Sequence, residues 1–292
     1  MRASLQEKQA LLPESITLVA NPGTKRRLRR FIPRSKRLEK NSPGLQRGDD
    51  FLGQKTKSLG WGIRKEGRTL WTRNAVKGSS VGSERRKREG RIEWRRWDHT
   101  RSKVAAALVK TNSDPSLLLP EKSSTCLYLG ASSGSTVSHI HDIVCGSQNH
   151  HNGQVVAVEI SPRMVRDLVS LSEVRRGLVP VLGDARIPMQ VSPFIREKAD
   201  WIHQDLSIAD QALTFVRMTT SFLKHGGIAL LSLKAASERS ADGDDQSRFD
   251  KAEGILLDSN LDLLERIDIS GLEEQHVVFR CTLNKVQSIL DN

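Results

Sequence analysis

The sequence has no long hydrophobic run, since no apolar stretch approaches the roughly 18 residues that a membrane-spanning helix needs. Its beginning, MRASLQEKQALLPESITL, also lacks the continuous apolar core of a signal peptide. Cysteine is scarce: the three residues form no CxxC pair, which fits free thiols in a reducing compartment better than a disulfide framework. We therefore expect a soluble, intracellular protein with no membrane partner.

Negative charge is scarce in the first third of the chain. Residues 1–103 carry 28 Lys and Arg against 10 Asp and Glu, a net charge of +18. Residues 104–292 carry 18 against 24, a net charge of −6. Clusters such as KRRLRR (25–30) and RRKR (85–88) could be ordinary solvated surface. An excess this local nevertheless favours nucleic acid as a partner, with the chemistry in the less basic part.

The chain divides into three parts by pattern. Residues 1–57 have mixed polarity and no sustained period, which predicts a basic, disordered extension. In residues 58–100, Trp, Ile and Leu alternate with charged residues at short intervals and are interrupted by glycines. This pattern predicts a small β-rich domain with antiparallel strands. Residues 101–110 are alanine-rich and amphipathic, so we expect a helix there that opens the main domain, 101–292.

Strand and helix patterns alternate from residue 125 onward. Helical patterns such as 162–175 and 208–223 fill most gaps between seven strand-like runs, at 125–130, 154–160, 178–183, 199–204, 227–234, 261–269 and 276–283. Repeated βα units predict a parallel sheet with helices on both faces. Only SGLEEQ separates the last two runs, which makes them a hairpin. The sequence therefore predicts an α/β fold with a seven-stranded, doubly wound sheet whose seventh strand is antiparallel.

A glycine turn, GASSGST (130–136), joins the first of these strands to a helix. It has no Lys after its second glycine, so it is not a P-loop, and it lacks the GxGxxG spacing of dinucleotide-binding turns. Gly130 and Gly134 would let the backbone approach a ligand at the helix N-terminus, with Ser135 and Thr136 facing the crevice. Such a turn is weak evidence alone, because glycine there can serve packing.

An acidic residue stands at the end of each of the next two strands. Glu159 is placed to bind ribose hydroxyls, and Asp184 to accept a hydrogen bond from an adenine amino group. Together they predict an adenosine-containing cofactor without a pyrophosphate, for which S-adenosylmethionine is the leading candidate. A nicotinamide cofactor is the alternative, and the missing GxGxxG counts against it.

The same segments resemble fibrillarin, the family of box C/D 2'-O-methyltransferases. The resemblance runs from about residue 58 to 283 and rests on YLGASSGSTVSHIHDIV, AVEISPRMVRDL, PVLGDAR, QDLSIADQ and HGGIALLSLKA. Residues 1–55 lack the Gly/Arg-rich tail of eukaryotic fibrillarins, so the archaeal fibrillarin-like rRNA/tRNA 2'-O-methyltransferase is the closer match. The resemblance implies a class I, Rossmann-like methyltransferase that uses S-adenosylmethionine.

The resemblance also implies partners and a place in the cell. The partners would be a box C/D guide RNA, the target rRNA or tRNA, a Nop-type scaffold protein and a kink-turn-binding, ribosomal-like protein. The protein would be cytoplasmic in an archaeal-like cell and nucleolar in a eukaryote.

A catalytic Lys-Asp-Lys-His set is implied by the resemblance, at Lys103, Asp205, Lys234 and His276. Topology supports it, because predicted strands four and five end, and antiparallel strand seven begins, at one edge of the sheet. Lys234 would activate the 2'-hydroxyl, Asp205 would orient that lysine and hold the acceptor, and His276 would position the ribose or relay the proton. Taken singly, each residue also fits a structural role, such as a helix cap for Asp205.

The cofactor contacts implied by the resemblance are Gly130, Ser135, Thr136, Glu159, Ile160, Asp184, Ala185, Asp205, Leu206, Ser207 and Ile208. Ile160 stands where the family commonly has an aromatic residue, and Ile208 where it has glutamine. These departures bear on cofactor affinity more than on reaction type. Cys145, His150 and His151 match no standard zinc spacing and lack a fourth ligand, so no metal site is predicted.

Two other classes of function stay open. One is a class I methyltransferase acting on protein glutamine or another substrate, because the fold alone does not set the substrate. The other is a catalytically weak scaffold subunit of an RNP. The complete Lys-Asp-Lys-His set argues against the scaffold, and the basic first third argues against a small-molecule substrate.

Overall fold

The computed structural model describes residues 56–238 and 243–284, which belong to one compact unit spanning Leu52–Asn292. The predicted disordered extension lies outside the described residues, except for its last two. The boundary expected between residues 100 and 101 stays a prediction. Among the described helices, none is both long and apolar enough to cross a membrane.

A five-stranded antiparallel sheet comes first in the described chain, in the region predicted to be β-rich. Its strands, in the order β1-β2-β3-β5-β4, are β1 (Thr56–Gly60), β2 (Ile63–Glu66), β3 (Thr69–Arg73), β4 (Arg86–Glu89) and β5 (Ile92–Trp97). Two of its hairpins have two-residue turns that begin with glycine, Gly67 and Gly90, both at φ +56°. Such turns need positive φ because their twist must match that of the strands.

The main sheet has the predicted seven strands. They are β6 (Thr125–Leu129), β7 (Gln154–Glu159), β8 (Leu178–Leu182), β9 (Ala199–Gln204), β10 (Leu223–Lys234), β11 (Leu261–Asp268) and β12 (His276–Leu283), in the order β11-β12-β10-β9-β6-β7-β8. The last strand, β12, runs antiparallel between β10 and β11, so this prediction is confirmed. The strand order reverses between β6 and β9, which is where open α/β sheets bind ligands.

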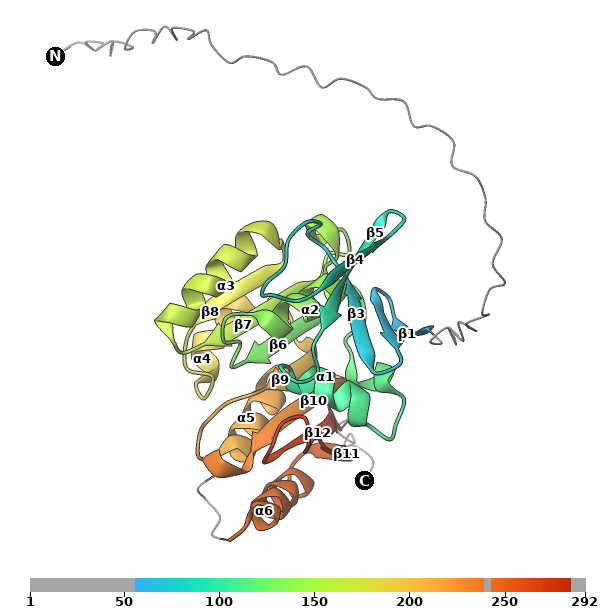
Figure 1. The fold of residues 1–292 in the computed structure, drawn as a ribbon. Helices are drawn as coiled ribbons and strands as arrows, with labels where there is room; N and C mark the ends of the chain where they lie inside the picture. Colours follow the sequence, from blue (N-terminus) through green and yellow to red (C-terminus); the bar gives the residue numbers. More distant parts are fainter. Residues whose placement is uncertain (1–55, 239–242, 285–292) are drawn as a thin grey trace, which may run out of the picture. The chain divides into compact units, whose positions relative to one another are not determined.

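Helices cover both faces of the main sheet (Figure 1). One buried apolar cluster joins the sheet to α1 (Lys103–Lys110), α2 (Ser135–Val144) and α3 (Pro162–Val174). A second cluster joins the other face to α4 (Pro188–Val191), α5 (Gln211–Phe222) and α6 (Asp245–Leu257). Helix α5 begins three residues later than predicted, so the loop after β9 spans residues 205–210.

A buried ionic network fastens the small sheet to α2 and α3. The Arg95 guanidinium donates to Asp142 Oδ2 at 2.7 and 3.1 Å, and to Glu84 Oε1 at 2.7 Å. Asp142 also accepts from Arg175 Nε at 3.2 Å. Burial alone would raise the pKa of Asp142, but the two arginines bring it well below its usual range. Because an unpaired buried charge costs several kcal/mol, this network holds the two sheets together.

Candidate active site

The four predicted catalytic side chains come from elements that meet at the carboxyl edge of the main sheet. Lys234, the last residue of β10, pairs in register with His276, the first residue of β12. Asp205 directly follows β9. Lys103 is the first residue of α1, which packs on the face of the main sheet that α2 and α3 also cover. The topological argument for convergence therefore holds, while the catalytic roles of these residues stay predictions.

Asp205 is held by a different lysine from the one predicted. Lys103 Nζ donates to Asp205 Oδ2 at 2.9 Å, and this pair is partly exposed. Asp205 was expected to orient Lys234, whose ammonium has no ion pair with any described residue. The correction follows from the placement of α1, whose first residue lies over the end of β9.

Ser102 places Lys103, and sequence reasoning missed it. Its hydroxyl oxygen caps α1 by accepting from Ala105 N at 3.3 Å, and it also accepts from Trp97 Nε1 at 3.0 Å. Ser102 Oγ and Thr136 Oγ1 are also hydrogen-bonded at 3.0 Å, with Ser102 as the donor because its two lone pairs are already used. Thr136 was predicted to face the crevice, but its hydroxyl joins α2 to α1. A serine directly before an amphipathic helix was the available signal.

Gln211 holds the end of β10, and it too was missed. Strand β9 pairs with β10 only as far as Gln204 and Leu231, so the backbone of Lys234 has no strand beside it on that side. The buried Gln211 side chain takes the place of that strand, because Lys234 N donates to its Oε1 at 3.1 Å and its Nε2 donates to Lys234 O at 3.0 Å. Gln204 Nε2 in turn donates to Gln211 O at 2.8 Å.

His276 presents one free ring nitrogen. Its Nδ1–H donates to the Glu274 carbonyl at 2.6 Å, since a carbonyl can only accept. Burial lowers the pKa of His276, and only 8% of the residue is exposed. The neutral ring therefore keeps a lone pair on Nε2, which has no hydrogen-bond partner among the described residues. This nitrogen is suited to accept a proton.

A second histidine, not predicted, lies beneath the site. His203 is fully buried on β9, where Nε2 hydrogen-bonds with Ser232 Oγ at 2.8 Å and the ring meets Tyr128 edge-on at 4.6 Å. Burial lowers the pKa of His203 to about 4. His203 is therefore neutral at pH 7, and its ring connects Tyr128 to Ser232 of β10 below the site.

A cavity of about 70 Å³ opens beside this edge, at the reversal of strand order. It is lined by seven of the predicted cofactor residues, namely Gly130, Glu159, Ile160, Asp184, Ala185, Leu206 and Ile208, together with Val158, Gly183 and Arg186. Four predicted residues do not line it: Ser135, Thr136, Asp205 and Ser207. Ser135 is instead exposed and lines a separate cleft.

Two carboxylates stand on the rim of this cavity, and both are fixed. Glu159 accepts from Ser132 N at 2.8 Å and from Ser161 N at 2.9 Å, one bond to each oxygen. Asp184 is held by the Arg186 guanidinium at 2.6 to 3.0 Å, and this bond lowers the pKa of Asp184. Both groups keep free lone pairs, so the cavity offers two acceptors for hydroxyl or amino groups.

The two glycines of the turn have a packing role. A Cβ at Gly130 would lie 2.1 Å from the Asp205 carbonyl oxygen, and one at Gly134 would lie 2.7 Å from Leu171 Cδ2. Both residues also have positive φ, +82° and +91°. A side chain at either position would thus clash with the protein itself, so glycine is needed here whether or not a ligand approaches.

The histidines of loop 145–153 are engaged in ring contacts. The His151 and Trp61 ring centroids are 4.0 Å apart, and those of His150 and His151 are 3.9 Å apart. Across residues 56–238 and 243–284, no group of three or more His, Cys, Asp or Glu side chains is placed to hold a metal ion.

Comparisons with known proteins bear on the whole of this region. The family model described as Fibrillarin matches residues 56–285. The fibrillarin-like rRNA/tRNA 2'-O-methyltransferase of Methanocaldococcus jannaschii is 34% identical over 224 residues, which is 76% of this chain and 90% of that protein.

Two solved structures are also similar. Aeropyrum pernix fibrillarin in complex with natively bound S-adenosyl-L-methionine has a TM-score of 0.65 and 30% identity, covering 75% of this chain and 93% of that one. A fibrillarin/Nop5p complex has a TM-score of 0.61 and 29% identity, covering 74% and 94%.

Proposed function

We propose, because this chain belongs to the fibrillarin family, that it transfers a methyl group from S-adenosylmethionine to ribose 2'-hydroxyls of rRNA or tRNA. The observation that carries the proposal is the position of the Lys103–Asp205 pair and the Lys234–His276 pair. Both lie at the sheet edge beside a cavity with two carboxylate acceptors.

The cavity fits an adenosine-containing cofactor. Glu159 would accept from the ribose hydroxyls and Asp184 from the adenine amino group, while Ile160 and Ile208 supply apolar walls. Ile160 is 63% exposed, so a bound ring would cover apolar surface that now faces water. When bound, the cofactor supplies a methyl group on a positively charged sulfur, which makes the methyl electrophilic.

The remaining work falls to the chain's own residues. A ribose hydroxyl must be aligned and must lose its proton for the oxygen to attack. The Lys234 ammonium, on a backbone position held by Gln211 and β12, would donate to the hydroxyl oxygen and stabilise its developing negative charge. His276 Nε2 would accept the proton, and the Asp205 carboxylate, fixed by Lys103, would hold the acceptor ribose.

The proposed enzyme works within an RNP. A fibrillarin/Nop5p complex among the similar structures supports a Nop-type scaffold protein as a partner. A box C/D guide RNA and a kink-turn-binding protein complete the proposal, because the less basic part, residues 104–292, offers no recognisable sequence-reading module in its sequence and site selection would come from base pairing. The protein would then be found where these RNPs are, in the cytoplasm of an archaeal-like cell or in a nucleolus.

Tritiated-methyl transfer to RNA tests this function. We expect the isolated chain to bind the cofactor yet methylate free RNA poorly, and to become active when scaffold, kink-turn-binding protein and box C/D RNA are added. Lys234→Ala should abolish activity with assembly preserved. Lys224→Ala, at the other end of the same strand, is the matched control and should leave activity intact.

Three results would contradict the proposal. Methylation of protein and not of RNA would favour the alternative class of methyltransferase. Full activity in Lys234→Ala would remove that residue from catalysis. Efficient, site-specific methylation by the chain alone would show that no guide is needed.

A further inference from the structure

A second cleft lies between the small sheet and the start of α2. Its volume is about 230 Å³, and it shares no lining residue with the cofactor cavity. One wall is the loop between β3 and β4 with strand β5, and the other is the turn before α2. The lining residues are Val81, Gly82, Ser83, Glu84, Arg85, Arg96, Trp97, Asp98, Arg101, Ser102, Ser133, Ser135 and His139.

Three arginines in this cleft are unpaired. The side chains of Arg85, Arg96 and Arg101 form no ion pair and no hydrogen bond with any residue that the structure describes. Neighbouring basic residues behave differently, since Arg86 is paired with Glu93 and Lys87 with Glu66. Arginine side chains without carboxylate partners around one cleft leave it ready to bind an anion.

The acidic residues of the cleft are already engaged. Glu84 is paired with the buried Arg95, and its carboxylate also accepts from Val81 N and Gly82 N, each at 2.8 Å. Burial raises the pKa of Asp98, but its two hydrogen bonds from Thr100 and the nearby charge of Arg96 bring it below its usual range. Asp98 therefore offsets part of the charge of Arg96, and the charge that remains in the cleft is mainly positive.

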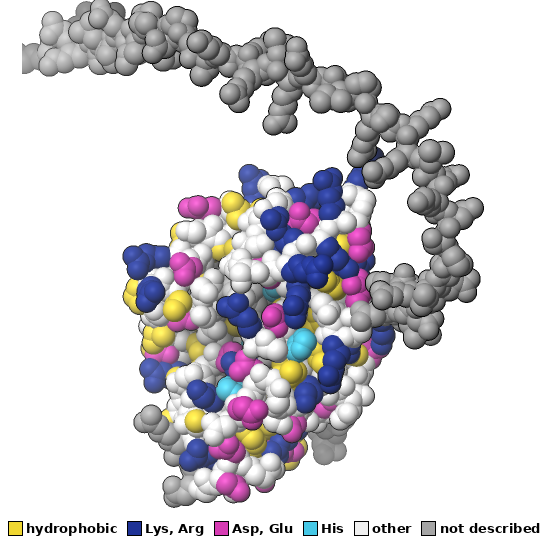
Figure 2. Space-filling model, in the orientation of Figure 1, with side chains coloured by type: hydrophobic (Ala, Val, Ile, Leu, Met, Phe, Trp, Pro, Cys, Tyr) yellow, Lys and Arg dark blue, Asp and Glu magenta, His cyan; other side chains and the backbone are white. Residues whose placement is uncertain are grey.

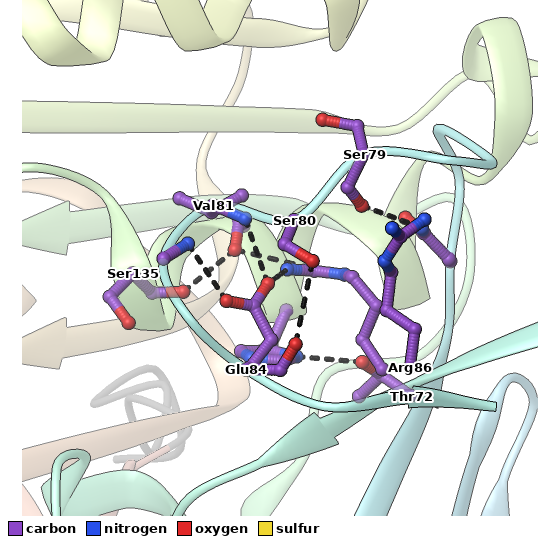
Figure 3. Close-up of polar contacts among 12 residues, drawn as sticks. Thr72, Ser79, Ser80, Val81, Glu84, Arg86 and Ser135 are labelled. Carbon is purple, nitrogen blue, oxygen red and sulfur yellow. Dashed lines mark hydrogen bonds and ion pairs between the residues drawn. The ribbon is translucent and has the colours of Figure 1, made fainter.

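The walls of the cleft are held in place. Figure 3 shows Ser80, Val81 and Glu84 turned toward one another, with Ser135 of α2 beside them. Arg95 joins these two sides, because it binds Glu84 on the loop and both Ser138 and Asp142 on α2. The backbone that carries the arginines is thus held in place by this network, and only the arginine side chains are left for a ligand to order.

The cleft adjoins the catalytic edge. Ser102 lines it, and the next residue, Lys103, makes the ion pair with Asp205. Ser135 on the opposite wall is the first residue of α2, where free backbone N–H groups and the helix dipole add positive potential. On the face shown in Figure 2, Lys and Arg side chains gather over the region of β3, β4 and β5, whereas the region of α6 mixes both signs.

We propose that this cleft binds the phosphodiester backbone of the RNA next to the nucleotide whose ribose is methylated. The inference rests on the proposed function, which makes RNA the substrate. Arg85, Arg96 and Arg101 contact successive phosphates, and because phosphate contacts read no sequence, they fix the strand for any target that a guide selects. The bound RNA strand would then run from the ribose at Lys234 and His276, past Arg101, into the cleft.

The test compares two triple variants of the full chain. Arg85→Gln, Arg96→Gln and Arg101→Gln are combined in the cleft variant. Arg68→Gln, Lys77→Gln and Arg91→Gln are combined in the control variant. These residues are exposed and unpaired and belong to the same part of the chain, and replacing them removes three positive charges, as in the cleft variant. Affinity for single-stranded RNA is measured at several salt concentrations. The cleft variant should lower the slope of log affinity against log salt by about 2, with at least roughly tenfold weaker binding, and the control should change it far less.

Equal losses in the two variants would overturn the proposal. Calorimetry of S-adenosylmethionine binding, expected to be unchanged in both, shows that the fold is intact. Arg101→Gln alone replaces the cleft variant if the triple variant does not fold, and it should still weaken RNA binding more than Arg68→Gln. RNA binding needs no methyl transfer, so the two proposals fail separately. A wild-type chain that binds RNA through the cleft but never methylates it, even in the assembled RNP, refutes only the function. A cleft variant with an unchanged affinity for RNA refutes only the cleft.

Discussion

Replacing Gln211 with alanine tests the support of the catalytic lysine. The side chain is fully buried and makes two hydrogen bonds, one to the backbone N and one to the backbone O of Lys234. Alanine leaves both backbone groups without their partner at a place where β9 has already ended. The end of β10, and with it the backbone from which the Lys234 side chain extends, should then lose its fixed position.

The size of the effect follows from these bonds. Leaving a buried backbone group unsatisfied costs about 1–3 kcal/mol, and water entering the space left by glutamine would recover part of that. We therefore expect the free energy of unfolding to fall by about 2–4 kcal/mol. The kcat of methyl transfer should fall as well, because a misplacement of about 1 Å at a reacting group can cost on the order of 100-fold in rate.

Urea denaturation, single-turnover methyl transfer and cofactor calorimetry measure these effects. Cofactor affinity should not change, because Gln211 does not line the cofactor cavity. Thr219→Val is the control, since Thr219 is equally buried on α5 but bonds only to Phe215 and Val216 of its own helix. If both variants lose stability and both keep full kcat, Gln211 is only structural and the positioning argument is wrong.

Three further substitutions test other parts of the structure. Asp184→Ala should weaken S-adenosylmethionine binding by about 1–3 kcal/mol in calorimetry, and an unchanged affinity would remove Asp184 from the site. Asp142→Asn should lower the free energy of unfolding by about 3–5 kcal/mol in urea, since it leaves Arg175 buried without a counter-charge and Arg95 with Glu84 as its only one. Because burial lowers the pKa of His203 to about 4, the unfolded chain binds a proton that the folded chain does not below pH 6.5. Stability should therefore fall by about 3 kcal/mol as the pH drops from about 6.5 to about 4, and His203→Asn should remove this part of the pH dependence in urea titrations.

The fold could be predicted because its signals are local. Most strands of the main sheet contain a short apolar run, and the brief connection before β12 allows only an antiparallel return. The placement of Asp205, Lys234 and His276 at one edge then follows from strand direction alone, with no knowledge of side-chain contacts. The helix predicted from residue 208 began too early, because α5 starts only at Gln211.

The pairing of side chains could not be predicted, because it depends on how elements pack. Lys103 and Asp205 are 102 residues apart, and nothing in either segment shows that α1 lies over the end of β9. The role of Gln211 could not be predicted for the same reason, because its bonds to Lys234 form only when the start of α5 packs beside the last residue of β10. The arginines of RRKR also look alike in sequence, yet Arg86 is paired and Arg85 is not.

The buried Arg95 sets an order of events during synthesis. A chain leaves the ribosome N-terminus first, at roughly 5–20 residues per second, so the strands of the small sheet are available before the rest. Arg95 must nevertheless stay hydrated until Asp142, 47 residues downstream, has emerged, and Asp142 in turn awaits Arg175. The inner face of the small sheet therefore closes only after α3 has been made. The small sheet is therefore made before the main sheet but is among the last parts to mature, and a nascent chain stalled before Arg175 should still be open to proteases there.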